Sequence, residues 1–375
     1  MQHKHFPTPF LLMFFLLFSF FSLTGCSRDT PQRAVKKELN LIKELDENTI
    51  KAFVSYEDMM NSSSSKSDIG SETTEAVKLF FKNFNYKIKH ASIEDNHATV
   101  HVAITNLDTH ALAKDVCLAL VQKSTGSSGE EMTLNSYFAL LGDVLSKNTY
   151  KTTTTDADIE LLHTEDGWMI QNTDQLEDDL VSGFISYLKD PYLVTPEEMI
   201  TVVLEGLMEK SPDEWKSYLN MQDIFSTYSQ NYEKTDDALA VQLSKHISYK
   251  ILSVTEDQEQ ESASAKITIT SLDMKSVLKR YQELLMNYAS TTESIRASSS
   301  ELADETASLL AQALAENTDT TDTEVTIHFT NNGSSWEMQL NEDFTNALLG
   351  NAGAAIQAFQ NGSEDLSEST SETEP

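Results

Sequence analysis

The chain has 375 residues, of which 59 are acidic and 27 are basic, so its formal net charge is −32. This excess of carboxylates argues against nucleic acid as a partner, since phosphate binding needs clustered Lys and Arg. Two cysteines are too few for a disulfide framework or a Cys-rich zinc module. The 39% of apolar residues suffices for real cores, and at ~150 residues per domain the length suggests two domains.

The N-terminus predicts a leader that is removed. An apolar run of about 14 residues, from Phe10 to Leu23, follows a weakly basic start that contains Lys4. The run is shorter than the ~20 residues of a membrane-spanning helix and suits the apolar region of a signal peptide. The small residues Thr24 and Gly25 stand directly before Cys26 and let a peptidase approach the backbone.

The four residues Leu23-Thr24-Gly25-Cys26 resemble the lipobox of bacterial lipoproteins, in which an aliphatic residue, a small residue and Gly or Ala precede a cysteine. The resemblance implies that residues 1–25 are a signal peptide and that Cys26 becomes the first mature residue, carrying a diacylglyceryl thioether with acyl chains such as palmitate. Two acyl chains give durable membrane anchoring, so residues 26–29 become a lipidated linker. The alternative is a leader with an incidental cysteine.

The rest of the chain predicts two copies of one unit, 165 residues apart. Thr30-Pro31 and Thr195-Pro196 each place a helix cap before a proline suited to the first helical turn. Glu198 completes a capping box in the second copy, and Ser211-Pro212-Asp213-Glu214 repeats the pattern. After the two starts, apolar residues recur at helical spacing: Val35, Leu39 and Ile42 in one copy, and Ile200, Val203, Leu204 and Leu207 in the other.

Each copy continues with strands and a helix. Residues 97–112 align with residues 262–277, with 5 of 16 positions identical. Both segments begin with alternating apolar and polar residues, which predicts a strand with one buried and one solvated face. Both strands end at Leu-Asp, where a helix begins. The helix of the second copy carries one apolar stripe, made of Met274, Val277, Leu278, Tyr281, Leu284, Leu285 and Tyr288.

A second hairpin closes each copy. Its turns, Glu165-Asp166-Gly167 and Asn331-Asn332-Gly333, contain Asp-Gly and Asn-Gly, which are strong hairpin signals. Trp168 and Trp336 follow the turns at equivalent positions. We expect both indoles to pack against the helices in a core rather than to stack on a ligand.

The repeat predicts two globular domains, residues 30–190 and 191–350, because a period this long is not that of a solenoid. The boundary is placed at Asp190-Pro191, since a residue before proline avoids the helical conformation. Two stretches are predicted to lie outside the cores, namely a Ser-rich polar loop at 61–74 and an acidic disordered tail at 361–375.

The order of helices and hairpins, the Leu-Asp strand end and the Trp of the last hairpin resemble bacterial lipoproteins with the cone-shaped nuclear-transport-factor-like (cystatin-like) fold. The resemblance implies helices packed on a curved antiparallel sheet in each domain, which is the α+β class. Members of that fold include enzymes and non-catalytic proteins, so the fold does not decide the function.

Some members of this fold hold a Tyr–Asp pair in a pocket for proton transfer. The corresponding candidates are Tyr86 with Asp108 and Tyr249 with Asp273. Such chemistry needs a desolvated Asp beside a hydrogen-bond donor. Each Asp also stands at the start of a helix, where its side chain would cap unpaired amides. We favour capping and keep catalysis as the alternative.

No metal site, cofactor motif or nucleophile motif is predicted. His97 and His101 share a strand face but lie roughly 13 Å apart along the strand, and the other mature histidines have no ligand spacing. Glu177-Asp178-Asp179 lacks the glycine of a calcium loop and is interpreted as a solvated helix face. Cys117 is either a reactive thiol or a small apolar residue on a helix, and the sequence favours the latter without deciding whether the thiol reacts.

Together the patterns predict a lipid-anchored protein on the extracytoplasmic face of the cell membrane. It would act as a non-catalytic binding or interaction module for an unknown protein or small molecule. The alternative is an extracytoplasmic enzyme that uses a Tyr–Asp pocket. Without Lys4 the mature charge is 26 − 59 = −33, which an anionic membrane repels, so attachment should depend on Cys26.

Overall fold

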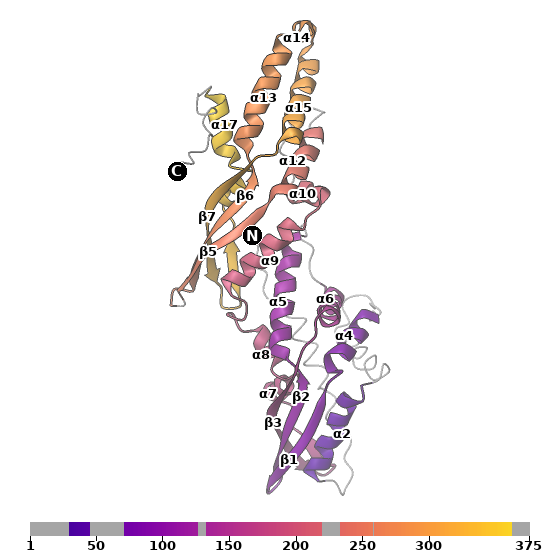
Figure 1. Ribbon diagram of the computed structural model, residues 1–375. Coiled ribbons are helices and arrows are strands. Elements are labelled where there is room, and N and C mark those ends of the chain that lie inside the picture. The colour runs from indigo at the N-terminus through magenta and orange to yellow at the C-terminus, as the bar shows by residue number, and fades with distance from the viewer. Residues whose placement is uncertain (1–29, 46–70, 127–132, 220–232, 258, 362–375) are drawn as a thin grey trace. The chain divides into compact units, whose positions relative to one another are not determined.

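A computed structural model describes residues 30–45, 71–126, 133–219, 233–257 and 259–361 (Figure 1). Apart from two short segments, these residues divide into two compact units, of which the first reaches Val194 and the second begins at Thr195. The division falls four residues after Asp190. The second unit continues past residue 350, because the helix α17 (Ala352–Gln360) belongs to it.

The first unit contains a four-stranded antiparallel sheet in the order β1-β2-β3-β4, with helices packed against it. Its elements in chain order are α2 (Pro31–Lys43), α4 (Ser71–Phe81), β1 (Asn85–Glu94), β2 (His97–Leu107), α5 (Thr109–Gly126), α6 (Leu134–Lys147), β3 (Thr152–Thr164), β4 (Gly167–Ile170), α7 (Asp174–Leu180) and α8 (Phe184–Leu188).

The second unit repeats this sheet with the order β5-β6-β7-β8. Its elements are α9 (Pro196–Met208), α10 (Pro212–Tyr218), α12 (Glu233–His246), β5 (Ser248–Asp257), β6 (Ser262–Leu272), α13 (Met274–Ala289), α14 (Thr292–Arg296), α15 (Ser299–Glu316), β7 (Thr320–Asn331), β8 (Trp336–Gln339), α16 (Glu342–Leu348) and α17. The predicted α+β class is confirmed, with one four-stranded antiparallel sheet in each unit.

Each sheet buries one face, as the alternation predicted. Ala98, Val100, Val102 and Ile104 of β2 are at most 4% exposed, and their counterparts on β6, Ala263, Ala265, Ile267 and Ile269, are at most 6% exposed. The opposite faces carry surface ion pairs in both units. Lys89 pairs with Asp156 at 2.5 Å in the first unit, and Lys266 pairs with Glu324 at 2.5 Å in the second.

The two sheets share their irregularities as well as their strand order. The pairing of the first two strands shifts register between Ile88 and His90 in one unit and between Ile251 and Ser253 in the other, which are positions 163 residues apart. A bulge placed identically in two sheets indicates one architecture used twice, because the shift re-aims every side chain beyond it. The predicted duplication is therefore visible in backbone geometry as well as in residue identity.

The same left-handed connection joins the last two helices of each unit. Ser182 and Gly183 have φ values of 56° and 81°, and Gly350 and Asn351 have values of 67° and 57°, so the pairs match at an offset of 168 residues. A Cβ on Gly350 would lie 1.9 Å from the carbonyl oxygen of Leu272. The second unit therefore requires glycine at a position where the first unit carries serine.

The helices α13 and α15 run side by side as one long pair joined by α14 (Figure 1). Of the apolar stripe predicted on α13, only Val277 and Leu278 are buried, and Met286 is 62% exposed. Ile295 of α14 is 82% exposed. The stripe identified the apolar side of α13 correctly, but in its second half this side is only partly covered. No helix among the described residues is long and apolar enough to cross a membrane.

The predicted Ser-rich loop at 61–74 is corrected at its end. The helix α4 begins at Ser71, and Thr73 and Thr74 are 1% and 5% exposed. Both threonines belong to the buried side of α4, which continues through Ala76, Val77 and Phe80. The Ser and Thr composition hid this helix start, since these residues also favour loops. Residues 61–70 of the loop, and the acidic tail from residue 362, lie outside the described residues.

Candidate functional site

The lipobox residues, Cys26 included, lie outside the residues that the structure describes. The first described residue is Thr30, which directly precedes α2 and occupies its cap position. Only three residues, 27–29, separate Cys26 from Thr30. At no more than ~3.6 Å per residue, a lipid on Cys26 would hold the start of α2 within about 14 Å of its point of attachment.

The structure uses both candidate aspartates as helix caps. Asp108 Oδ1 accepts a hydrogen bond from the Ala111 amide at 3.1 Å, where α5 begins. Asp273 Oδ1 accepts from the Lys275 amide at 3.0 Å, and its Oδ2 accepts from the Ser276 hydroxyl at 2.8 Å. The capping interpretation is confirmed for both residues, since these carboxylates satisfy amides that would otherwise lack partners at the helix starts.

The two candidate tyrosines bind the first helix of their units. Tyr86 donates to Asn40 Oδ1 at 2.6 Å, and Tyr249 is hydrogen-bonded to the side chain of Thr201. Burial raises the pKa of both phenols above 10, and a nearby carboxylate in each unit raises it further. A phenol with a raised pKa stays protonated at neutral pH. Each tyrosine thus ties the first strand of its sheet to the first helix.

Cys117 lies on α5 with 7% of its surface exposed. Burial raises the pKa of its thiol to about 12. Because the thiolate is the reactive form, a thiol with this pKa is inert near neutral pH. The structure therefore places Cys117 as a small apolar residue of the first core.

The histidines of the first sheet form a surface pair. The His101 ring stacks on the His90 ring with centroids 4.0 Å apart, and His101 Nδ1 lies 2.5 Å from Asp158 Oδ1. His97 is exposed at the start of β2. Among the residues that the structure describes, no three His, Cys, Asp or Glu side chains gather closely enough to hold a metal ion.

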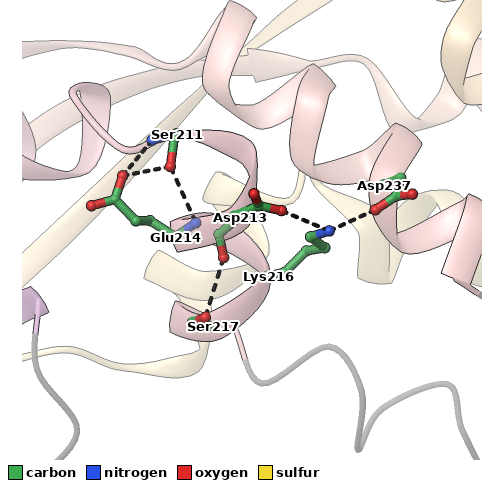
Figure 2. A network of polar contacts seen from close by, with 6 residues as sticks. All are labelled: Ser211, Asp213, Glu214, Lys216, Ser217 and Asp237. Atoms are coloured by element: carbon green, nitrogen blue, oxygen red, sulfur yellow. Dashed lines mark hydrogen bonds and ion pairs between the residues drawn. The ribbon is translucent and has the colours of Figure 1, made fainter.

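A polar network joins α10 to α12 in the second unit, as Figure 2 shows. Lys216 Nζ lies 2.9 Å from Asp213 Oδ1 and 2.7 Å from Asp237 Oδ1. Hydrogen bonds to the two carboxylates raise the pKa of Lys216, Asp237 having the larger effect. At the start of α10 the predicted capping box is confirmed, because Ser211 and Glu214 exchange side-chain and backbone hydrogen bonds. The capping box predicted at Thr195 and Glu198 is confirmed too.

Sequence reasoning missed two buried residues on α10 and α12. Trp215 of α10 is 0% exposed, and Asp236 of α12 is 7% exposed. Trp215 Nε1 and Asp236 Oδ1 are buried atoms without a hydrogen-bond partner. Burial raises the pKa of Asp236, and Asp237 adds to the effect. The burial of Trp215 holds α10 against the rest of the second unit.

The two equivalent tryptophans differ in burial. Trp336 is 2% exposed, whereas Trp168 is partly buried, packs against the first core and meets His163 edge-on with ring centroids 4.9 Å apart. Both indoles pack in a core, as predicted, and Trp336 is the more deeply buried of the two.

The acidic run at 177–179 is not a uniformly solvated face, so that prediction was wrong for Glu177. Glu177 is 3% exposed, and its Oε1 accepts from the side-chain Nδ2 of Asn172 at 2.8 Å, while Oε2 has no partner. Leu176 and Leu180 are buried on the same short helix, α7. The helical period places Glu177 on the same face as Leu180, because the two residues are three positions apart.

We expect Glu177→Gln to stabilise the protein at pH 7. Burial raises the pKa of Glu177 above 4.5, so the folded chain holds this proton more tightly than the unfolded chain. The buried carboxylate therefore destabilises the fold at neutral pH. This penalty disappears as the pH falls below the pKa that Glu177 has in the unfolded chain. Calorimetry should show a Tm gain on the order of 2–4 °C at pH 7, corresponding to about 1 kcal/mol, and none at pH 3.5.

The exposed residue Glu165 serves as the matched control for this prediction, because Glu165→Gln removes the same charge from the surface. A Glu177→Gln gain that persisted unchanged at pH 3.5 would mean that the carboxylate is not the cause.

Comparison with known proteins assigns no family. No protein-family model matches the chain, and no curated protein matches it. A crystal structure of the Bacillus subtilis candidate lipoprotein ycdA matches with 14% identity and a TM-score of 0.25, over 71% of this chain and 95% of that chain. A likeness at this level assigns neither a fold nor a function to the present chain.

Proposed function

We propose that this protein is an extracytoplasmic lipoprotein, held on the cell membrane by a lipid on Cys26, whose two α+β units form a non-catalytic binding or interaction module. The observation that carries the proposal is the complete lipobox at Leu23–Cys26, directly after an apolar run of signal-peptide length. Each unit, with helices on a four-stranded antiparallel sheet, is proposed to be of the cone-shaped nuclear-transport-factor-like class.

The non-catalytic role is supported by how the Tyr–Asp candidates are used. Asp108 and Asp273 cap helices, and Tyr86 and Tyr249 bind the first helices. In neither unit does a described hydrogen bond join the Tyr to the Asp, as a shared proton-transfer pair would require. The partner of the module is proposed to be a protein or a small molecule, and a thermal-shift screen that raises Tm with a ligand would identify its chemistry.

We expect Cys26→Ala to move the protein from the membrane fraction to the soluble extracytoplasmic fraction almost completely. Two acyl chains bind a bilayer durably, and a body of charge −33 (26 − 59) has little other affinity for anionic lipid. The measurement is quantitative immunoblotting of fractionated cells in ~0.15 M salt.

The control is Cys117→Ala, because Cys117 is buried in the first core and its removal should leave the partition unchanged. A Cys26→Ala chain that stayed with the membrane would rule out the lipid on Cys26 as the anchor.

A further inference from the structure

The exposed face of α2 is basic. Pro31, Val35, Leu39 and Ile42 form its buried face, and the exposed positions include four cations, Arg33, Lys36, Lys37 and Lys43. With Glu38 as its only acid, Pro31–Lys43 carries 4 − 1 = +3. This concentration of positive charge is unusual in a chain whose formal net charge is −32.

Packing on the sheet fixes which way this face points. The helix α2 contacts β1, β2 and β4 through its apolar side. Tyr86 of β1 donates to Asn40 Oδ1 at 2.6 Å and contacts the Lys36 carbonyl oxygen at 3.3 Å, and Lys43 Nζ donates to Asn85 Oδ1 at 2.9 Å. These contacts fix how α2 lies on the sheet, with Arg33, Lys36 and Lys37 exposed and Lys43 exposed but bonded to the edge of β1.

The equivalent helix of the second unit provides an internal comparison. At the offset of 165 residues, Arg33, Lys36, Lys37 and Lys43 correspond to Glu198, Thr201, Val202 and Met208. The helix α9 contains three glutamates and no basic residue, so it carries −3. The two copies keep the same buried spacing and differ by six charges in total, 3 − (−3). Packing alone does not require that difference, because it is confined to residues outside the buried face.

The basic helix is also the one next to the lipidation sequence. Cys26 lies four residues before Thr30, so the start of α2 would lie within about 14 Å of an anchor at Cys26. At physiological salt an exposed charge acts over about 8 Å. A cationic face tethered this closely to anionic headgroups is attracted to them, whereas the acidic body is repelled.

We propose that the exposed face of α2 docks on anionic lipid headgroups around the anchor and so orients the first unit on the membrane. This inference rests on the proposed lipid anchor at Cys26. The anchor supplies the attachment, and Arg33, Lys36 and Lys37 select the side of the unit that faces the lipid.

The test uses a fluorescent probe that reports on its surroundings, placed by Leu41→Cys in the full lipidated protein. Leu41 lies on the exposed side of α2 and is 46% exposed. Labelling should be specific, because the sulfur of Cys26 is blocked by lipid and Cys117 is buried with a pKa of about 12. The matched probe is Met208→Cys on α9, a position that is 40% exposed.

The labelled proteins are compared in vesicles of zwitterionic lipid and in vesicles with about one third phosphatidylglycerol. We expect the Leu41→Cys probe to shift its emission to the blue only in the anionic vesicles. The shift should disappear at 1 M salt, where charges act over about 3 Å, and in the triple variant Arg33→Gln, Lys36→Gln, Lys37→Gln. The Met208→Cys probe should show no shift in any vesicle.

The possible failures are distinguishable. An unchanged Leu41→Cys emission on anionic vesicles, in a protein shown by its mass to carry lipid on Cys26, overturns the docking of α2 alone. A shift that survives the triple variant also overturns it, because the cations would then not be its cause. A membrane-derived protein without lipid on Cys26 overturns the anchor and the docking together.

Discussion

Replacing Gly350 by alanine is expected to destabilise the second unit by at least about 3 kcal/mol. The new Cβ would lie 1.9 Å from the Leu272 carbonyl oxygen, an overlap with backbone that no side-chain rotation relieves. Alanine also disfavours the φ of +67° by roughly 1–2 kcal/mol. The shift needed to relieve the overlap would break the hydrogen bond from the Met274 amide to the Gly350 carbonyl. Calorimetry should show a Tm loss of about 6–12 °C.

The first unit supplies a control with the opposite sign. Ser182 stands at the matching place with φ of 56°, and its hydroxyl oxygen is buried without a partner. Ser182→Gly relieves the left-handed strain and removes this hydroxyl, so we expect a gain of about 1 kcal/mol. Effects of opposite sign at two equivalent positions would be difficult to explain without the shared connection. A neutral Gly350→Ala would show that the close approach to Leu272 is wrong.

The second large effect is expected from Trp215→Ala. Trp215 is among the largest fully buried side chains and anchors the seven-residue helix α10. Removing a buried indole leaves a cavity that the surroundings fill only in part, at a typical cost of 3–5 kcal/mol. The loss should appear in thermal unfolding as a Tm decrease of roughly 10 °C, with Trp336 fluorescence reporting on the second unit.

Two further variants distinguish the loss of buried volume at Trp215 from the loss of the ion pairs of Lys216. Trp215→Phe keeps most of the volume and removes the buried Nε1 donor, which has no partner, so its cost should stay below about 1.5 kcal/mol. Lys216→Gln breaks the ion pairs with Asp213 and Asp237 at the surface and should shift Tm far less than Trp215→Ala. If Lys216→Gln were the more damaging variant, the network of Figure 2 and not the buried indole would hold α10 in place.

Much of the fold could be predicted because duplication presents each signal twice. The capping boxes at Thr195 and Ser211, the alternation in β2 and β6, and the turns before Trp168 and Trp336 all depend on neighbours within a few residues. Signals that depend only on nearby residues can be recognised from the sequence alone. The helix α8 was missed, because its five residues are too few for a helical period to show, and of the seven-residue α7 only the acidic run was interpreted as helical.

Burial depends on partners that a sequence does not name. The period of α13 shows which side is apolar, but not that this side is only partly covered beyond Leu278. Composition placed Glu177 at the surface, whereas its neighbours on α7 bury it. The burial of Trp215 and Asp236 was equally inaccessible, since it depends on how α10 and α12 pack in the second unit. Asp108 and Asp273 could be assigned as caps, because capping is local to a helix start.

The most direct measurement for the proposed anchor is the mass of the N-terminal peptide of the protein purified from native membranes. We predict a chain that lacks residues 1–25 and begins at Cys26, with the added mass of a diacylglyceryl group on the cysteine sulfur. A membrane-bound chain that retains residues 1–25, or that begins elsewhere with an unmodified Cys26, would contradict the proposal.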